Sequence, residues 1–143
     1  MARHILMAAA LCLPSAALAE APVTVPFDGS FADATFAVEN AIVGKGLVVD
    51  YVSHVGDMLN RTGADVGSDR MLFKGADIFL FCSAVVSREV MEADPMNIQH
   101  CPYGIFVIED DQGVRIGRRD YPAGPMDKVE ALLDGIIADA AGR

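Results

Sequence analysis

Basic residues are scarce in this sequence of 143 residues. It has 11 Lys and Arg against 20 Asp and Glu, so its formal net charge is −9 at neutral pH. Nucleic acids and anionic lipid surfaces attract basic proteins, so nucleic acid is excluded as a partner and an acidic membrane surface is disfavoured. The acidic residues are scattered rather than gathered in a run, which indicates a solvated surface.

The sequence also lacks internal repeats, low-complexity tracts and an interior linker. It has three cysteines and no C-x-x-C motif, which argues against a thioredoxin-type redox protein. The longest apolar stretch, residues 5–19, is interrupted by Pro14 and is shorter than the roughly 20 residues of a membrane span. These absences favour one compact domain without a retained transmembrane helix.

The amino terminus has the features of a secretory signal peptide. Arg3 precedes the apolar stretch, and Ala17-Leu18-Ala19 forms a small-x-small cleavage site before Glu20. A lipid anchor at Cys12 is not expected, because the preceding Leu11 is too large for that processing. We therefore predict that residues 1–19 are removed, leaving residues 20–143 as a periplasmic or secreted domain that has no membrane association.

Helices are expected in four places. A capping-box-like Ser30 and Asp33 start the first, which Gly44 and Gly46 end. A short helix ending at Gly63 would place Val55, Met58 and Leu59 toward the core, and another should follow Ser83 and end at Pro95. The last, from Pro125 to Gly142, carries one continuous apolar stripe: Val129, Leu132, Leu133, Ile136, Ile137 and Ala140.

Strands are expected between these helices. The stretch 47–53 is rich in β-branched residues, and 76–82 and 103–109 are apolar at consecutive positions, as in strands covered on both faces. Residues 110–113, DDQG, form a turn that leads into a returning strand at 114–120. The pattern predicts an α+β domain with helices on a small mixed or mostly antiparallel sheet, and it leaves the strand order open.

Two stretches carry a family resemblance. "FCSAVVSREVMEADPMNIQHCPYGIFVIE" and "VRIGRRDYPAGPM" resemble the DUF302 family of small α+β domains, in particular its secreted members; "ADPMNIQHCPY" and "PAGPM" are the most specific parts. The similarity spans roughly residues 31–140. It implies a compact α+β sandwich, and it offers no catalytic residues, because no function is established for that family.

Cys82 and Cys101 are the cysteines of the mature chain. In an oxidising compartment an even pair suggests a disulfide, and closing this loop would stabilise the fold by roughly 3 kcal/mol. Cys82 ends one predicted strand and Cys101 begins the next. Parallel neighbours would hold them about 20 Å apart, so the bridge requires antiparallel strands or strand ends brought together. Alternatively, both are reduced and buried.

Other uses of these cysteines stay open. Met91, Met96 and His100 lie close in sequence to Cys101, and with Cys82 this soft donor set would select copper, or ligate haem, although the spacing matches no established ligand pattern. A nucleophilic Cys101 would need a lowered pKa. His100 points to the opposite face of an extended chain, so the fold would have to bring His100 or His54 in. His54 otherwise has no companion and is assigned a structural role.

A small basic patch is the best candidate without cysteine. Arg115 and Arg119 share one face of a strand, with Arg118 on the other, and Tyr121 follows. They could bind a carboxylate or another anion, or simply pair in solvent with Asp120 and Glu109.

We therefore expect a non-enzymatic module that binds a small molecule or a periplasmic protein, with no cofactor, stapled by Cys82 and Cys101. A redox or copper-handling protein using Cys82, Cys101, His100 and Met96 is the alternative. A thiol-dependent enzyme or sulfur carrier is the third.

Overall fold

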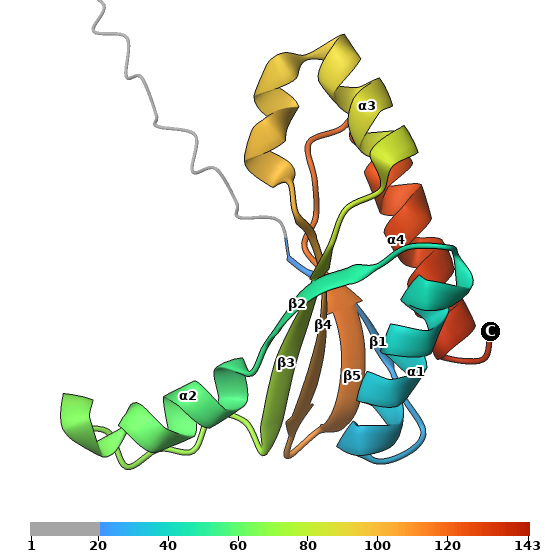
Figure 1. The fold of residues 1–143 in the computed structure, drawn as a ribbon. Coiled ribbons are helices and arrows are strands. Elements are labelled where there is room, and N and C mark those ends of the chain that lie inside the picture. Colours follow the sequence, from blue (N-terminus) through green and yellow to red (C-terminus); the bar gives the residue numbers. More distant parts are fainter. Residues whose placement is uncertain (1–20) are drawn as a thin grey trace, which may run out of the picture.

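A computed structural model describes residues 21–143 of the chain; the predicted signal peptide lies outside the described residues. Four α-helices, two short 3-10 helices and five strands follow the order of Figure 1. The helices are α1 (Phe31–Gly44), α2 (Val55–Thr62), η1 (Ala64–Val66), α3 (Ala84–Ala93), η2 (Pro95–His100) and α4 (Asp127–Ala140). The strands are β1 (Val23–Pro26), β2 (Val49–Ser53), β3 (Gly75–Phe81), β4 (Tyr103–Asp110) and β5 (Gly113–Arg118).

The strands form one antiparallel sheet in the order β1-β5-β4-β3-β2. The predicted class, a single compact α+β domain with helices packed on a mostly antiparallel sheet, is confirmed. The edge strand β1 was missed, because its four residues include Pro26 and carry little strand signal of their own. Val23 pairs with Arg118 and Val25 with Ile116, so β5 supplies the partner that makes this segment a strand.

Helix α1 begins as its capping box predicts. The Ser30 hydroxyl accepts a hydrogen bond from the Asp33 amide at 3.1 Å, and the Asp33 carboxylate accepts one from the Ser30 amide at 3.1 Å. Ala34, Val38 and Ile42 recur at helical spacing and are fully buried. The capped helix therefore presents one apolar face to the sheet.

Helices α1 and α4 cover the same face of the sheet (Figure 1). This covered face supplies the odd-numbered residues of β3 and β4, including Phe79, Phe81, Tyr103, Ile105 and Val107, which join the helices in one core. Helix α4 starts at Asp127, two residues after the expected Pro125, because residues 123–126 form a turn. All but Leu132 of its predicted stripe are buried, and Leu132 packs against the core.

The second face of the sheet is largely uncovered, contrary to the prediction for β3 and β4. The runs in β3 and β4 predicted coverage on both faces, yet Ile78, Leu80, Phe106 and Ile108 are only half-buried. Among residues 21–143, only the start of α2 packs on this open face, where Gly56 lies against Ala76. The prediction was wrong because neighbouring apolar side chains partly cover each other on an open sheet, as Phe106 does over Gly117.

Helix α2 also departs from expectation. It ends at Thr62 before Gly63, as predicted, but it extends away from the sheet (Figure 1). Met58 is 43% exposed, and the half-buried Val55 and Leu59 do not pack against the core, so the predicted core contacts of this helix were wrong. Within the described part of the chain, no helix has the length and apolar character needed to span a membrane.

Candidate functional site

The antiparallel register of β3 and β4 brings the two cysteines to the same end of these neighbouring strands. Phe81 pairs with Tyr103, so Cys82 follows the last pair on one strand while Cys101 precedes it on the other. The antiparallel arrangement that the proposed disulfide required is therefore present. The two residues are free thiols. They lie near each other, but not at the distance of a disulfide bond.

The environment of Cys82 keeps its thiol protonated. Burial, followed by the hydrogen bond and charge interaction with Cys101, raises the pKa of Cys82 to about 12. Because the thiolate is the reactive form, a thiol with this pKa is a poor nucleophile at neutral pH. Cys82 directly precedes α3, whose cap is Ser83; that hydroxyl accepts a hydrogen bond from the Val86 amide at 3.3 Å. Cys82 is therefore not an activated thiol.

Aromatic side chains surround the end of β3 and β4 where the cysteines lie. The His100 ring lies 5.6 Å from the ring of Tyr121 in an edge-on arrangement, and Tyr121 lies 6.4 Å from Tyr103. The hydroxyls of Tyr103 and Ser87 hydrogen bond at 3.0 Å. Burial raises the pKa of both tyrosines. The fold thus places His100 and Tyr121, two predicted site residues, beside the strand that begins after Cys101.

The predicted arginine patch divides between two ends of the sheet. Arg119 is exposed just beyond β5, with its guanidinium carbon 5.9 Å from the centre of the Tyr121 ring. Arg115 lies four positions earlier, about 13 Å along a strand, and binds Asp110 and Gln112 at the β4–β5 turn, each at 2.6 Å. Arg119 and Tyr121 therefore lie together, whereas Arg115 belongs to the turn.

Arg118 forms a buried ion-pair network that the sequence did not identify. Its side chain is 6% exposed and donates to Asp134 at 2.6 Å and to Glu130 at 2.7 Å, with Asp120 at 3.6 Å. Its hydrogen bonds to the Asp134 carboxylate are the main reason that the pKa of Arg118 is raised. Two features of the sequence could have indicated this network. Arg118 lies on the opposite strand face from Arg115 and Arg119, and Glu130 and Asp134 lie one turn apart on the last helix.

The soft donors predicted for copper do not converge as a set. Met96 is 64% exposed on η2, and Met91 packs against the core. Among residues 21–143, no group of three or more His, Cys, Asp or Glu side chains is placed to hold a metal ion. The donors that the fold does bring near each other are Cys82 and Cys101.

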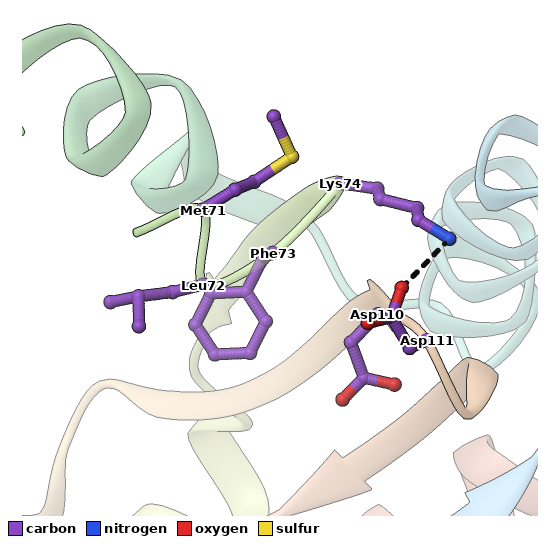
Figure 2. A pocket seen from close by; sticks show the side chains of 6 residues that line it. All are labelled: Met71, Leu72, Phe73, Lys74, Asp110 and Asp111. Carbon is purple, nitrogen blue, oxygen red and sulfur yellow. Dashed lines mark ion pairs between the residues drawn. The ribbon is translucent and has the colours of Figure 1, made fainter. Parts of the chain in front are cut away.

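A shallow hollow of about 430 Å³ adjoins Cys82. It is lined by Lys45, Gly46, Leu47, Val48, Asp50, Cys82, Ser83, Ala84 and Val85. A smaller hollow of about 110 Å³, shown in Figure 2, lies near the β4–β5 turn and is lined by Met71, Leu72, Phe73, Lys74, Asp110 and Asp111. Lys74 and Asp111 form an ion pair at 3.2 Å there. None of the predicted site residues lines this second hollow.

His54 has the companion that its sequence did not reveal. Its Nδ1 lies 2.8 Å from Oδ1 of Asp77, and both residues line a cavity of about 310 Å³ beside α1. The assignment of His54 as a residue without a companion was therefore wrong. Asp77 is 23 residues away in sequence, and only the pairing of β2 with β3 brings the two side chains together.

Comparisons with known proteins agree with this architecture. The model of the family "Domain of unknown function DUF302" matches residues 23–134. A solved structure of an uncharacterised conserved DUF302 protein from Bacillus stearothermophilus is similar, with a TM-score of 0.68 and 16% sequence identity, and the match covers 83% of this chain and 97% of that chain. No curated protein matches the sequence. Since the family model covers most of the chain, the protein belongs to the DUF302 family.

Proposed function

We propose that the mature chain is a periplasmic or secreted binding module without enzymatic activity, closed at one end of β3 and β4 by a disulfide between Cys82 and Cys101. The observation that carries this proposal is the strand register, which places Cys82 one position after Phe81 and Cys101 two positions before its partner Tyr103. The predicted signal peptide supplies the oxidising compartment in which such a pair is normally bridged.

The raised pKa of Cys82 supports a structural role for the bridge. Disulfides that act as strong oxidants stabilise a thiolate in their reduced form. Burial of Cys82 has the opposite effect, because it disfavours the thiolate and so leaves the disulfide the more stable form. The same argument weighs against the thiol-dependent enzyme and sulfur-carrier alternative, which needs a reactive thiolate.

The proposed ligand site is the surface at Arg119 and Tyr121. The exposed guanidinium of Arg119 stacks over a ring that is only 3% exposed, which holds the cation in a defined place on an otherwise acidic protein. A carboxylate or another anion is the ligand chemistry that this arginine would recognise.

Counting thiols in the purified mature protein tests the bridge. We expect no free thiol under denaturing conditions before reduction and two afterwards, with a monomer on a non-reducing gel. A double Cys82→Ser, Cys101→Ser variant should lose about 3 kcal/mol of stability relative to the oxidised protein and match the reduced protein. Two free thiols in protein isolated from the periplasm would contradict the proposed bridge.

Anion titration tests the binding surface separately. Benzoate, followed by amide chemical shifts, should perturb residues 119–121, and Arg119→Gln should weaken its binding several-fold. Arg115→Gln is the matched control, because Arg115 is already bound to Asp110. Equal loss in both variants, or no change in either, would refute a site at Arg119.

Copper handling is a second candidate function, and one observation favours it: two neighbouring cysteine sulfurs beside a hollow that reaches Cys82. Two thiolates suit Cu(I), which accepts soft sulfur ligands. The reduced protein would then bind one equivalent of Cu(I) and lose it on Cys82→Ser, whereas Met96→Leu would have little effect because Met96 is exposed. Unchanged Cu(I) binding by the Cys82→Ser variant would exclude this site.

A further inference from the structure

We propose that the cavity beside His54 and Asp77 binds a small organic ammonium ion, that is, a primary amine in its charged form on an alkyl or aromatic body. The cavity of about 310 Å³ lies between α1 and the edge of the sheet formed by β2 and β3. It is lined by Thr35, Phe36, Glu39, Val52, His54, Asp77 and Phe79. Asp77 and Cys82 are five positions apart on one strand, about 17 Å, so this site does not depend on the disulfide.

The strand pairing fixes the histidine. Ser53 pairs with Ile78 at the end of the β2–β3 ladder, and His54 follows Ser53 while Asp77 precedes Ile78. The carboxylate of Asp77 is 14% exposed and contacts Nδ1 of His54 at 2.8 Å, while the imidazole is 62% exposed. A carboxylate accepts hydrogen bonds, so in the neutral ring the proton is on Nδ1 and Nε2 is an acceptor.

The other polar groups of the cavity are acceptors as well. Glu39 takes part in no hydrogen bond or ion pair among the residues that the structure describes. The Thr35 hydroxyl donates its proton to the Ala32 carbonyl at 2.9 Å, so its oxygen is left to accept. No lysine or arginine lines the cavity. With two carboxylates present, the complementary ligand carries a positive charge and several N–H donors.

The walls select an organic cation over a bare metal ion. Phe36, Val52 and Phe79 supply apolar surface, and Phe36 is 68% exposed on α1, where a ligand can reach its ring. A metal ion would need a closer group of donors, and no such group of three His, Cys, Asp or Glu side chains occurs within residues 21–143. An ammonium group on an alkyl or aromatic body fits both parts of the cavity, its charge toward the carboxylates and its body against the rings.

Three probes that share a 2-phenylethyl body separate the contribution of the charge from that of the N–H donors. The protein is titrated at about pH 8 with 2-phenylethylammonium, 2-phenylethanol and trimethyl(2-phenylethyl)ammonium, and amide chemical shifts are followed. We expect saturable binding of the primary amine, with shifts confined to α1, β2 and β3 around the cavity. The alcohol lacks the charge and the quaternary ion lacks N–H donors. The affinity of each should be at least about tenfold lower than that of the primary amine.

Single-charge variants assign the site. Glu39→Gln lies on the exposed face of α1 and should weaken amine binding about tenfold without changing the circular dichroism spectrum. Asp77→Asn should also weaken it, because it removes the second carboxylate. Glu92→Gln, on α3, is the matched control and should bind like the unmodified protein. The proposal is overturned if the amine does not saturate, if the alcohol binds equally well, or if Glu39→Gln leaves the affinity unchanged.

Discussion

The two faces of the sheet show how differently one strand can use the same residue type. Ile105 and Ile108 are three positions apart on β4; Ile105 is fully buried under the helices, and Ile108 is half-buried on the open face. Phe106, which lies between them, covers Gly117 of β5 rather than entering the core. The composition of the strand is nearly uniform, and the position of the helices alone decides which isoleucine belongs to the core.

Charged residues of β5 follow the same division. Arg118 faces the helices, and Glu130 and Asp134 of α4 receive its guanidinium. Arg115 faces the open side, where it binds Asp110 of the adjoining turn. A fully buried charge costs several kcal/mol unless it is paired, and the Arg118 side chain is 6% exposed. The side chains of Arg115 and Asp110 are 21% and 24% exposed, so their pair is nearer to solvent and contributes less. The covered face therefore depends more on its ion pairs than the open face does.

The largest expected effect comes from removing core volume on one face only. Ile105→Ala should destabilise the protein by about 3–4 kcal/mol, because it leaves a cavity in a fully packed region. Ile108→Ala should cost about 1 kcal/mol, since its side chain is already partly in water. Urea unfolding of the two variants measures both values. Equal losses would mean that the open face is covered in solution.

The two arginines give the next largest difference. Arg118→Met should cost about 2–3 kcal/mol, because it leaves Glu130 and Asp134 as like charges on one helix, partly solvated but unpaired. Arg115→Met should cost less than about 1 kcal/mol. Thermal unfolding compares them. Were Arg118→Met as stable as Arg115→Met, the buried network would be replaceable by packing alone.

Glycine contacts sharpen the comparison within the open face. A Cβ at Gly117 would lie 2.4 Å from the Phe106 ring and 2.6 Å from the Val23 carbonyl oxygen, so Gly117→Ala should cost about 1–2 kcal/mol. At Gly104 the nearest atom would be a Leu80 methyl at 3.4 Å, and Gly104→Ala should be tolerated. Chemical unfolding measures the stability of both variants. A stable Gly117→Ala variant would show that the Phe106 ring can move away from Gly117.

The smallest effect concerns the start of α1, away from both faces. Hydrogen bonds from the Ser30 hydroxyl, and then from its amide, lower the pKa of Asp33. The stabilisation that they give the folded state is therefore present above the unfolded carboxyl pKa of about 3.9, and it is lost as the pH falls through the lower folded value. Ser30→Ala should cost about 1 kcal/mol at neutral pH and move the pKa of Asp33 toward its ordinary value. Carboxyl NMR titration checks the shift; an unchanged pKa would contradict the capping bond.

Much of the fold could be predicted from local signals. The Ser30–Asp33 capping box, Gly63 after α2 and the DDQG turn each act within a few residues, so their effects can be recognised in sequence. Strand β1 was missed because it has a weak strand propensity and forms by pairing with β5. Helix η2 was missed although its start is local: the Asp94 carboxylate accepts a hydrogen bond from the Met96 amide at 2.9 Å. At the candidate sites, the need for antiparallel strands at Cys82 and Cys101 was foreseen, whereas the pairing of His54 with Asp77 was not.

The sequence by itself determined the α+β class and most helix boundaries, because propensity, capping and periodicity are properties of neighbouring residues. The family followed from the resemblance of ADPMNIQHCPY and PAGPM to DUF302 proteins, which the match over residues 23–134 confirms. Only the tertiary structure decided which arginine is buried, which apolar strand residues are in the core and which residues line the cavity at His54. Those properties depend on strand order and on the face that α1 and α4 cover, and both join residues that are distant along the chain.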